Sequence, residues 1–348
     1  MFVINYGTDI IKNTYDALAA SDISAYLKSH FAVAIKPNLV VSRPASEGAT
    51  THPEVVEGIV RFLKDFGVSN ISIIESAWIG DSTHQAFTVC GYESISKKYD
   101  IPLICLKSDA CTTLEYQGIR MEICNRALDT NFLINVPVLK AHCQTNLTCN
   151  MKNLKGCIPD SEKRRFHTLG LHRPIAALNA LVKTGYCVID GICGDLTFEE
   201  GGNPTYAHRI IVGRDPVMLD SYCAELIGYN PSDIEYLNLA KKWGLGNFYS
   251  PDSIITELNA NMKPSQTIIA SSIAARYAKQ ITEDGACSAC YAALVHALHR
   301  TKANGKFHIG QGYRSKTTDG VGIGNCTSGL KRYIPGCPSK ATDIIEGL

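Results

Sequence analysis

The alternation of short apolar runs with amphipathic segments between residues 32 and 106 constrains the fold of this chain most strongly. The run 32-AVAIKPNLVV-41 ends in Lys-Pro-Asn, and a proline cannot continue a central strand. Residues 54–67 have a helical apolar period and end at a glycine, and the second apolar run 71-ISIIES-76 follows. This order requires right-handed crossovers and predicts a mainly parallel sheet with helices on both faces.

Apolar runs and amphipathic segments alternate to about residue 250, and a cysteine- and glycine-rich segment follows. Further strands are predicted at 102–106, 131–139, 186–192 and 208–213, and further helices at 83–99, 174–183 and 215–228. Beyond residue 250 we expect a helix at 267–281, a Cys-x-x-Cys, a helix at 291–301 and a glycine-rich segment, 309–329. The predicted fold class is therefore α/β, with a mainly parallel, doubly wound sheet in residues 1–250 and a small cysteine-ligated module in residues 251–348.

The charge balance excludes several classes of partner. The 34 lysines and arginines nearly equal the 33 aspartates and glutamates, so no overall field attracts nucleic acid or an acidic membrane. The longest apolar runs, such as 131–139, are well short of the roughly 20 residues that cross a bilayer. The first residues also lack the features of an export signal. We expect a soluble, cytoplasmic protein without nucleic-acid or membrane partners; the sequence does not reveal its oligomeric state.

Fourteen cysteines are many for such a protein, and in a reducing compartment they are buried thiols or metal ligands. Ten of them are scattered, several within apolar runs, and small buried thiols are the simpler interpretation for these. The scattered cysteines are Cys90, Cys105, Cys111, Cys124, Cys143, Cys149, Cys157, Cys187, Cys193 and Cys223.

The four C-terminal cysteines have the pattern of ligands. Cys287 and Cys290 form a Cys-x-x-Cys, and Cys326 and Cys337 follow singly, each after a glycine or within two residues of one. A close pair with two later thiolates can complete the four-cysteine ligation of one [4Fe–4S] cluster. Glycines beside the ligands let backbone N–H groups approach the sulfur atoms. Three alternatives stay open: a structural zinc ion, a redox dithiol of the close pair, or chance in a cysteine-rich chain.

Polar side chains gather where the predicted strands end, and in doubly wound sheets ligands bind beyond the carboxyl ends of the strands. A basic, amide-rich stretch, 150–167, could hold a carboxylate or phosphate, whereas Lys163 to Arg165 is predicted to be a solvated charged loop. The residues predicted to bind an anionic small molecule are Lys36, Asn38, Glu75, Lys140, His142, Lys152, Asn153 and Glu200. His167 and Asp190 are the candidates for moving a proton.

Several spaced motifs resemble the DUF362 family of bacterial and archaeal proteins. They are Lys36-Pro37-Asn38, 51-THPEVV-56, 135-NVPVLKAH-142, 152-KNLKG-156, His167, 188-VIDGI-192, Glu200-Gly201 and 213-GRDPVMLD-220, and the tail 322-GIGNC-326 with 335-PGCPSKATDI-344 is similar to the cluster-binding end of such proteins. The resemblance implies an iron–sulfur protein of anaerobic metabolism but no settled reaction. One departure is 200-EGGNP-204, where the family tends toward Glu-Gly-Asn-Gly-Pro.

The first functional hypothesis is a redox protein with one cluster and an anion-binding crevice, which would make it an iron–sulfur oxidoreductase served by a redox partner protein. Two alternatives remain. The chain is a pure electron carrier or adaptor without its own substrate, or it is a metal-dependent hydrolase or transferase that uses Asp190, Glu200 and Asp220 and carries a structural cluster or zinc ion.

Overall fold

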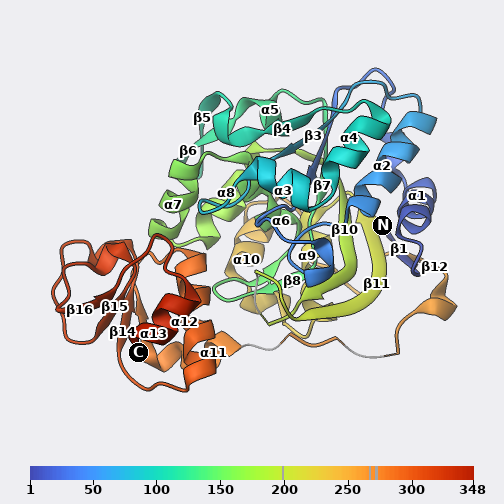
Figure 1. Cartoon of the computed structure of the whole chain (residues 1–348). Coiled ribbons are helices and arrows are strands. Elements are labelled where there is room, and N and C mark those ends of the chain that lie inside the picture. The colour runs from blue at the N-terminus through green and yellow to red at the C-terminus, as the bar shows by residue number, and fades with distance from the viewer. Residues whose placement is uncertain (198–199, 266–267, 271–272) are drawn as a thin grey trace.

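The computed structural model describes residues 1–197, 200–265, 268–270 and 273–348 (Figure 1). The strands of the body are β1 (Phe2–Tyr6), β2 (Val33–Pro37), β3 (Ile71–Glu75), β4 (Leu103–Cys105), β5 (Cys111–Tyr116), β6 (Ile119–Cys124), β7 (Phe132–Val136), β8 (Lys140–His142), β9 (Asn146–Thr148), β10 (Thr184–Asp195), β11 (Pro204–Gly213) and β12 (Ile255–Leu258). Its helices are α1 (Ile10–Ala19), α2 (Pro53–Asp65), α3 (Thr83–Val89), α4 (Tyr92–Tyr99), α5 (Asn125–Leu128), α6 (Asn150–Asn153), α7 (Asp160–Thr168), α8 (His172–Leu181), α9 (Pro216–Leu226) and α10 (Glu235–Lys242).

The body is built on an eight-stranded sheet in the order β12-β1-β11-β10-β7-β2-β3-β4. The pairs from β10 through β7, β2 and β3 to β4 are parallel, and so is the pair β1–β12. Strand β11 is antiparallel to both of its neighbours, β1 and β10, so it alone runs against the other strands of this sheet. The predicted α/β class with a mainly parallel sheet is confirmed.

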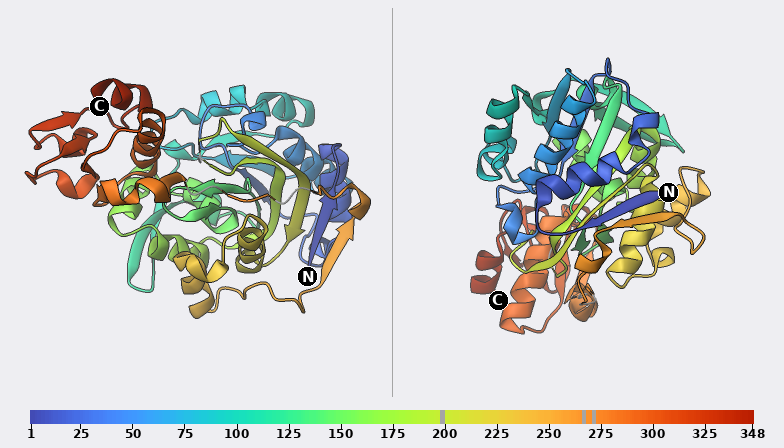
Figure 2. Two further views of the ribbon diagram at one scale, coloured as in Figure 1. Left: turned by 90° about the horizontal axis from the view of Figure 1, so that it is seen from below. Right: turned by 90° about the vertical axis from the view of Figure 1, so that its right-hand side faces the viewer.

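Helices cover both faces of the sheet, as the views in Figure 2 show. On one face Leu18 of α1, Val56 of α2 and Tyr92 of α4 belong to one buried apolar cluster. On the other face α8, α9 and α10 contribute residues such as Leu178 and Leu219 to a second cluster. A sheet that is buried on both faces explains why its strands are continuous apolar runs rather than alternating ones.

Two predicted elements differ from the observed ones for local reasons. The predicted helix 83–99 is divided into α3 and α4 at Gly91, whose φ of 81° interrupts the helical hydrogen bonds. The predicted strand 131–139 ends at Val136 because Pro137 has no N–H for the ladder.

The C-terminal module has its own four-stranded sheet, in the order β13-β14-β15-β16, with every pair parallel. Its elements are β13 (Ile281–Glu283), β14 (Phe307–Ile309), β15 (Val321–Ile323), β16 (Arg332–Ile334), α11 (Ile273–Tyr277), α12 (Ser288–Thr301) and α13 (Ala341–Gly347). Leu294 and Leu298 of α12 pack with Phe307, Ile323 and Ile334 in a separate apolar core. Figure 1 shows this module beside the body in orange and red.

Strand β12 lies beyond residue 250 but pairs with β1, so the polypeptide returns to the body sheet before it enters the module. The boundary at residues 250 and 251 stays a prediction. Part of the predicted helix 267–281 lies outside the described residues, and α11 is the helix that the structure describes there. Within the described ranges, no helix is both long enough and apolar enough to cross a membrane.

Candidate functional site

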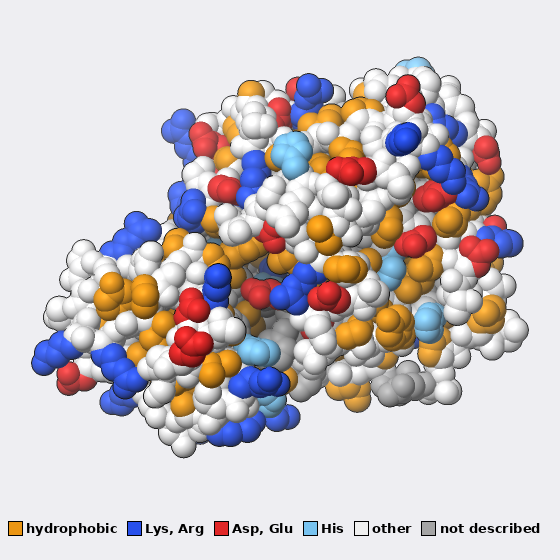
Figure 3. Space-filling view, viewed as in Figure 1, with side chains coloured by type: hydrophobic (Ala, Val, Ile, Leu, Met, Phe, Trp, Pro, Cys, Tyr) orange, Lys and Arg blue, Asp and Glu red, His pale blue; other side chains and the backbone are white. Residues whose placement is uncertain are grey.

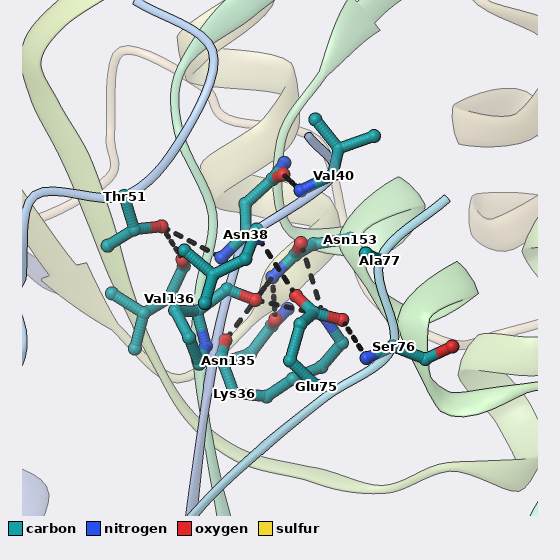
Figure 4. Close-up of polar contacts among 12 residues, drawn as sticks. Lys36, Asn38, Val40, Thr51, Glu75, Ser76, Ala77, Asn135, Val136 and Asn153 are labelled. Carbon is teal, nitrogen blue, oxygen red and sulfur yellow. Dashed lines mark hydrogen bonds and ion pairs between the residues drawn. The ribbon is translucent and has the colours of Figure 1, made fainter. Parts of the chain in front are cut away.

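A buried ion pair lies at the carboxyl ends of β2 and β3. Lys36 Nζ lies 2.9 Å from Glu75 Oε2, and both side chains are almost completely buried (Figure 4). The same Glu75 oxygen accepts a hydrogen bond from Leu39 N at 3.1 Å, and Oε1 accepts one from Ser76 N at 2.7 Å. A Cβ on Gly156 would overlap the ends of both side chains, so a larger residue at this position would displace the ion pair.

Amide side chains complete the hydrogen bonds of this pair. Asn153 Oδ1 accepts from Lys36 Nζ at 3.3 Å, while Asn153 Nδ2 donates to Asn135 Oδ1 at 2.8 Å. Beside them, Asn38 N donates to Thr51 Oγ1 at 2.8 Å (Figure 4). Because each polar group has a partner, the network holds the strand ends in one arrangement.

These residues form one wall of a cavity of about 120 Å³. All eight residues predicted to bind an anion line it, and so does His167. We call this cavity the crevice. Its lining also includes Lys155 and Lys163 and an apolar side formed by Val40, Val41, Trp78 and Ile79. The strand-end rule grouped Lys36, Asn38, Glu75, Lys140, His142 and Asp190 at one crevice, and of these only Asp190 is missing from the cavity lining. That these residues bind an anion stays a prediction.

His142 is a neutral side chain in the crevice. Burial lowers its pKa well below the usual value, and the positive charges of Lys152 and Lys155 lower it further. Its Nδ1 accepts hydrogen bonds from the backbone N–H groups of Gln144, at 3.1 Å, and Thr145, at 3.2 Å. A neutral imidazole that accepts at Nδ1 carries its hydrogen at Nε2, so His142 is a hydrogen-bond donor through Nε2.

His167 has the opposite tautomer. Lys155 Nζ lies 3.4 Å from His167 Nε2, and an ammonium group has only donors, so Nε2 is the acceptor. Burial lowers the pKa of His167 well below its usual value, with a further contribution from Lys155 and Lys152. The crevice thus holds two neutral histidines among several lysines.

The prediction that Lys163 to Arg165 form a solvated loop is wrong. These residues lie in α7, and Lys163 is buried. Its Nζ donates to Ser76 O at 3.2 Å and to Ala77 O at 2.8 Å, and burial lowers its pKa. The aliphatic stem and the three donors of lysine suit this position, where the ammonium fixes the segment that follows β3.

Asp190 does not join the crevice. Its Oδ2 accepts from His52 N at 2.7 Å and lies 2.8 Å from His52 Nδ1, and Oδ1 accepts from Ile192 N at 3.0 Å. The predicted strand 186–192 would end just after Asp190, whereas β10 continues to Asp195. Asp190 is therefore an internal residue of a long strand, and its carboxylate binds the loop that carries His52.

The four C-terminal cysteines line a second cavity, which we call the cysteine cavity. Cys287 precedes α12, four residues after β13 ends, while Cys326 and Cys337 follow the ends of β15 and β16. Carboxyl ends of parallel strands share one edge of a sheet, which explains why cysteines far apart in sequence meet there. From the end of β14, Gln311 Nε2 approaches Cys287 Sγ at 3.9 Å.

The two cavities adjoin. Trp78 and Ile79 line both of them, and Ser288 and Ala289, between Cys287 and Cys290, line the crevice. Figure 3 shows a hollow where the module meets the body, with basic and acidic side chains along its rim.

The junction is fixed by Gln144. Its Oε1 accepts from Ser288 Oγ at 2.6 Å, and its Nε2 donates to Ala286 O at 3.1 Å. Since Gln144 N also donates to His142, one short turn connects the crevice to the Cys-x-x-Cys segment.

Among the residues that the structure describes, no three His, Cys, Asp or Glu side chains surround a point as the ligands of one metal ion do. The three carboxylates that the hydrolase alternative would need, Asp190, Glu200 and Asp220, have different surroundings. Glu200 lines the crevice, Asp190 binds His52, and Asp220 accepts from Asn150 N at 2.8 Å and Met151 N at 3.0 Å.

Sequence reasoning did not identify Trp78, Ile79 and Gln311 as lining residues or Gln144 as the residue at the junction. Trp78 and Ile79 follow the strand that ends in Glu75, so the strand-end rule, applied a few residues further, would have found them. Gln144 lies in a turn and Gln311 begins a short 3-10 helix, and no sequence pattern marks either position.

Comparison with known proteins identifies a matching family and several similar proteins. The family model described as a domain of unknown function (DUF362) matches residues 33–225. A thylakoid-associated protein of Synechocystis, sll1697, is 25% identical over an alignment of 238 residues, with 63% of this chain and 70% of that protein covered.

Two solved structures are similar at low identity. The lactate racemase apoprotein from Thermoanaerobacterium thermosaccharolyticum has a TM-score of 0.44 at 10% identity, with 65% of this chain and 57% of that chain covered. A structural-genomics protein from Thermotoga maritima has a TM-score of 0.38 at 11% identity, with 68% and 60% covered. This chain thus spans less than two thirds of the length of either structure.

Proposed function

The chain belongs to the DUF362 family, and from this premise we propose that it is a redox protein in which one [4Fe–4S] cluster lies beside a crevice for a small anion. Cys287, Cys290, Cys326 and Cys337 are the proposed ligands. The observation that carries the proposal is the shared wall of the two cavities: Trp78 and Ile79 line the crevice and the cysteine cavity alike.

The chemistry of the cysteine cavity supports a cluster. Its four thiols line one cavity, and a Cβ on Gly324 would be in van der Waals contact with Cys290 Sγ, at 3.7 Å, so the backbone at Gly324 is a neighbour of that sulfur. A tetrahedral zinc ion with Zn–S bonds near 2.3 Å needs its sulfurs roughly 3.8 Å apart. In a four-iron cluster each cysteine binds a different iron, so the thiolates surround a larger volume.

When bound, the cluster would supply or accept one electron at a time. The residues of the crevice would bind and orient the anion. Lys140, Lys152 and Lys155 would bind the anionic group by charge-assisted hydrogen bonds. His142 would donate a hydrogen bond from Nε2 to an oxygen of the bound molecule, and this bond would strengthen as negative charge develops there.

His167 would exchange a proton with the bound molecule. A neutral imidazole whose acceptor nitrogen faces the ammonium of Lys155 can take a proton when that ammonium turns to bind the anion and leaves the nitrogen accessible. The electron itself would come from a redox partner protein, or be given to one.

Single substitutions of the four cysteines test the ligand assignment. We expect Cys287→Ala, Cys290→Ala, Cys326→Ala and Cys337→Ala each to lose most of the iron, sulfide and visible absorption of anaerobically purified protein, because each removes one of four ligands. Cys143→Ser is the matched control, since Cys143 Sγ lies 3.9 Å from Ser288 O, beside the site but outside the proposed set. If all four variants kept the metal content of the parent, the assignment would be wrong.

A further inference from the structure

Two cysteines outside the cysteine cavity face each other across the hairpin of β5 and β6. Cys111 and Cys124 are register partners, and their Sγ atoms lie 4.0 Å apart. The hairpin turns through Gln117, with φ of 52°, and Gly118, with φ of 73°. Two residues with positive φ form the tight turn that matches the twist of a hairpin, so this turn holds the two cysteines in register.

The backbone geometry at this pair suits a disulfide. Directly opposite residues in antiparallel strands have Cα atoms about 4.5–5.5 Å apart. Disulfides span Cα separations of about 4.4–6.8 Å. The sulfurs therefore need only to rotate about their side-chain bonds to reach bonding distance, and the strands can stay in place.

The two thiols differ in access. Cys111 is partly exposed, whereas Cys124 is buried and donates to Leu106 O at 3.4 Å. Leu106 precedes Lys107, whose ammonium donates to Trp78 O at 2.9 Å and to Asp81 O at 2.8 Å. Through Leu106, the Cys111–Cys124 pair is thus connected to Lys107. The hydrogen bond from Lys107 to Trp78 O holds part of the wall that the crevice and the cysteine cavity share.

We propose that Cys111 and Cys124 are a thiol–disulfide pair that low-molecular-weight disulfides oxidise. The Cys111 thiolate attacks one sulfur of the small disulfide, which forms a mixed disulfide and releases one small thiol. The Cys124 thiolate then attacks the Cys111 sulfur, which forms the Cys111–Cys124 bond and releases the second small thiol. Two protein thiols are oxidised and one small disulfide is reduced to two thiols.

The reaction should be slow at neutral pH and faster as pH rises. Burial raises the pKa of Cys111, and burial together with the neighbouring Cys111 raises the pKa of Cys124 further. Since the thiolate is the attacking species, the oxidation rate should increase with pH across the range 7–9.

Peptide mapping tests the proposal because trypsin separates the two cysteines. Cleavage after Lys107, Arg120 and Arg126 places Cys111 in peptide 108–120 and Cys124 in peptide 121–126. Holoprotein prepared without oxygen would be incubated with oxidised glutathione, quenched with N-ethylmaleimide, digested and analysed by mass spectrometry. We expect the two peptides to be joined by a disulfide within one chain, without covalent dimers. The oxidised protein should also have a higher thermal midpoint than the reduced protein, because the bond restricts the unfolded chain.

The controls are Cys111→Ser and Cys124→Ser, neither of which should show the shift in midpoint after the same treatment. Recovery of both peptides alkylated as free thiols would overturn the proposal. So would glutathione retained on Cys111 with Cys124 alkylated, because the second step would then be blocked. Cluster content is measured separately, so this result is independent of the proposed redox function.

Discussion

Lys36→Met is expected to lower the free energy of unfolding by about 3–5 kcal/mol, the range found when one partner of a buried ion pair is removed. The reason is the environment of Glu75, whose side chain is only 3% exposed and would be left buried without its ion-pair partner. Methionine nearly matches the volume of lysine, so little of the loss should come from a cavity. Urea denaturation monitored by circular dichroism measures the change.

The double variant Lys36→Met with Glu75→Gln separates the charge effect from packing. The glutamine has no charge to bury, and its one carbonyl oxygen can accept from either Leu39 N or Ser76 N, which donate to different oxygens of Glu75. We expect the double variant to recover part of the stability lost in the single variant. A single variant within about 1 kcal/mol of wild type would show that the pair contributes little, as exposed pairs do.

His52→Ala should be destabilising to a similar degree, about 3–5 kcal/mol at pH 6, because it leaves the fully buried Asp190 carboxylate without its cation. Burial opposes the charge on His52, but the charge and the hydrogen bond of Asp190 outweigh it, with a smaller contribution from Cys193, and the pKa of His52 is raised to about 11.

The pH dependence follows from the sign of this shift. A histidine whose pKa is higher in the folded protein than the unfolded value of about 6.5 binds its proton more tightly when folded. The stabilisation is complete below about pH 6.5 and is lost as the pH rises toward the folded pKa. The difference in unfolding free energy between wild type and His52→Ala should therefore decrease from pH 6 to pH 10. A difference that does not change over this range would contradict the assignment, and His52→Gln serves as a control that retains polar atoms.

Much of the body could be predicted from sequence because its signals are local. Apolar runs and helical periods predicted the sheet, and the polar residues Lys36, Asn38 and Glu75 near strand ends predicted one side of the crevice. The orientation of β11 was not predictable, since a short apolar run does not say whether its neighbour is parallel. For the same reason the sequence did not show that the strand containing Asp190 continues to Asp195, which makes Asp190 an internal strand residue.

Lys163 illustrates a second limit. Its sequence context, between Glu162 and Arg164, is that of a solvated segment, and only the tertiary structure reveals carbonyl oxygens of Ser76 and Ala77 arranged around its ammonium. Buried charges with several partners have no pattern in the chain, because those partners are distant in sequence. The cysteines are a contrasting case: their spacing suggested a common site, and in the folded chain they line one cavity.

The central claim is that the four thiolates of the cysteine cavity hold one iron–sulfur cluster, and the direct test is EPR with iron, sulfide and zinc analysis on protein purified without oxygen. We expect about four iron and four sulfide per chain and a low-temperature signal of a single cluster after reduction by dithionite. One zinc per chain without sulfide, or no bound metal at all, would contradict this claim.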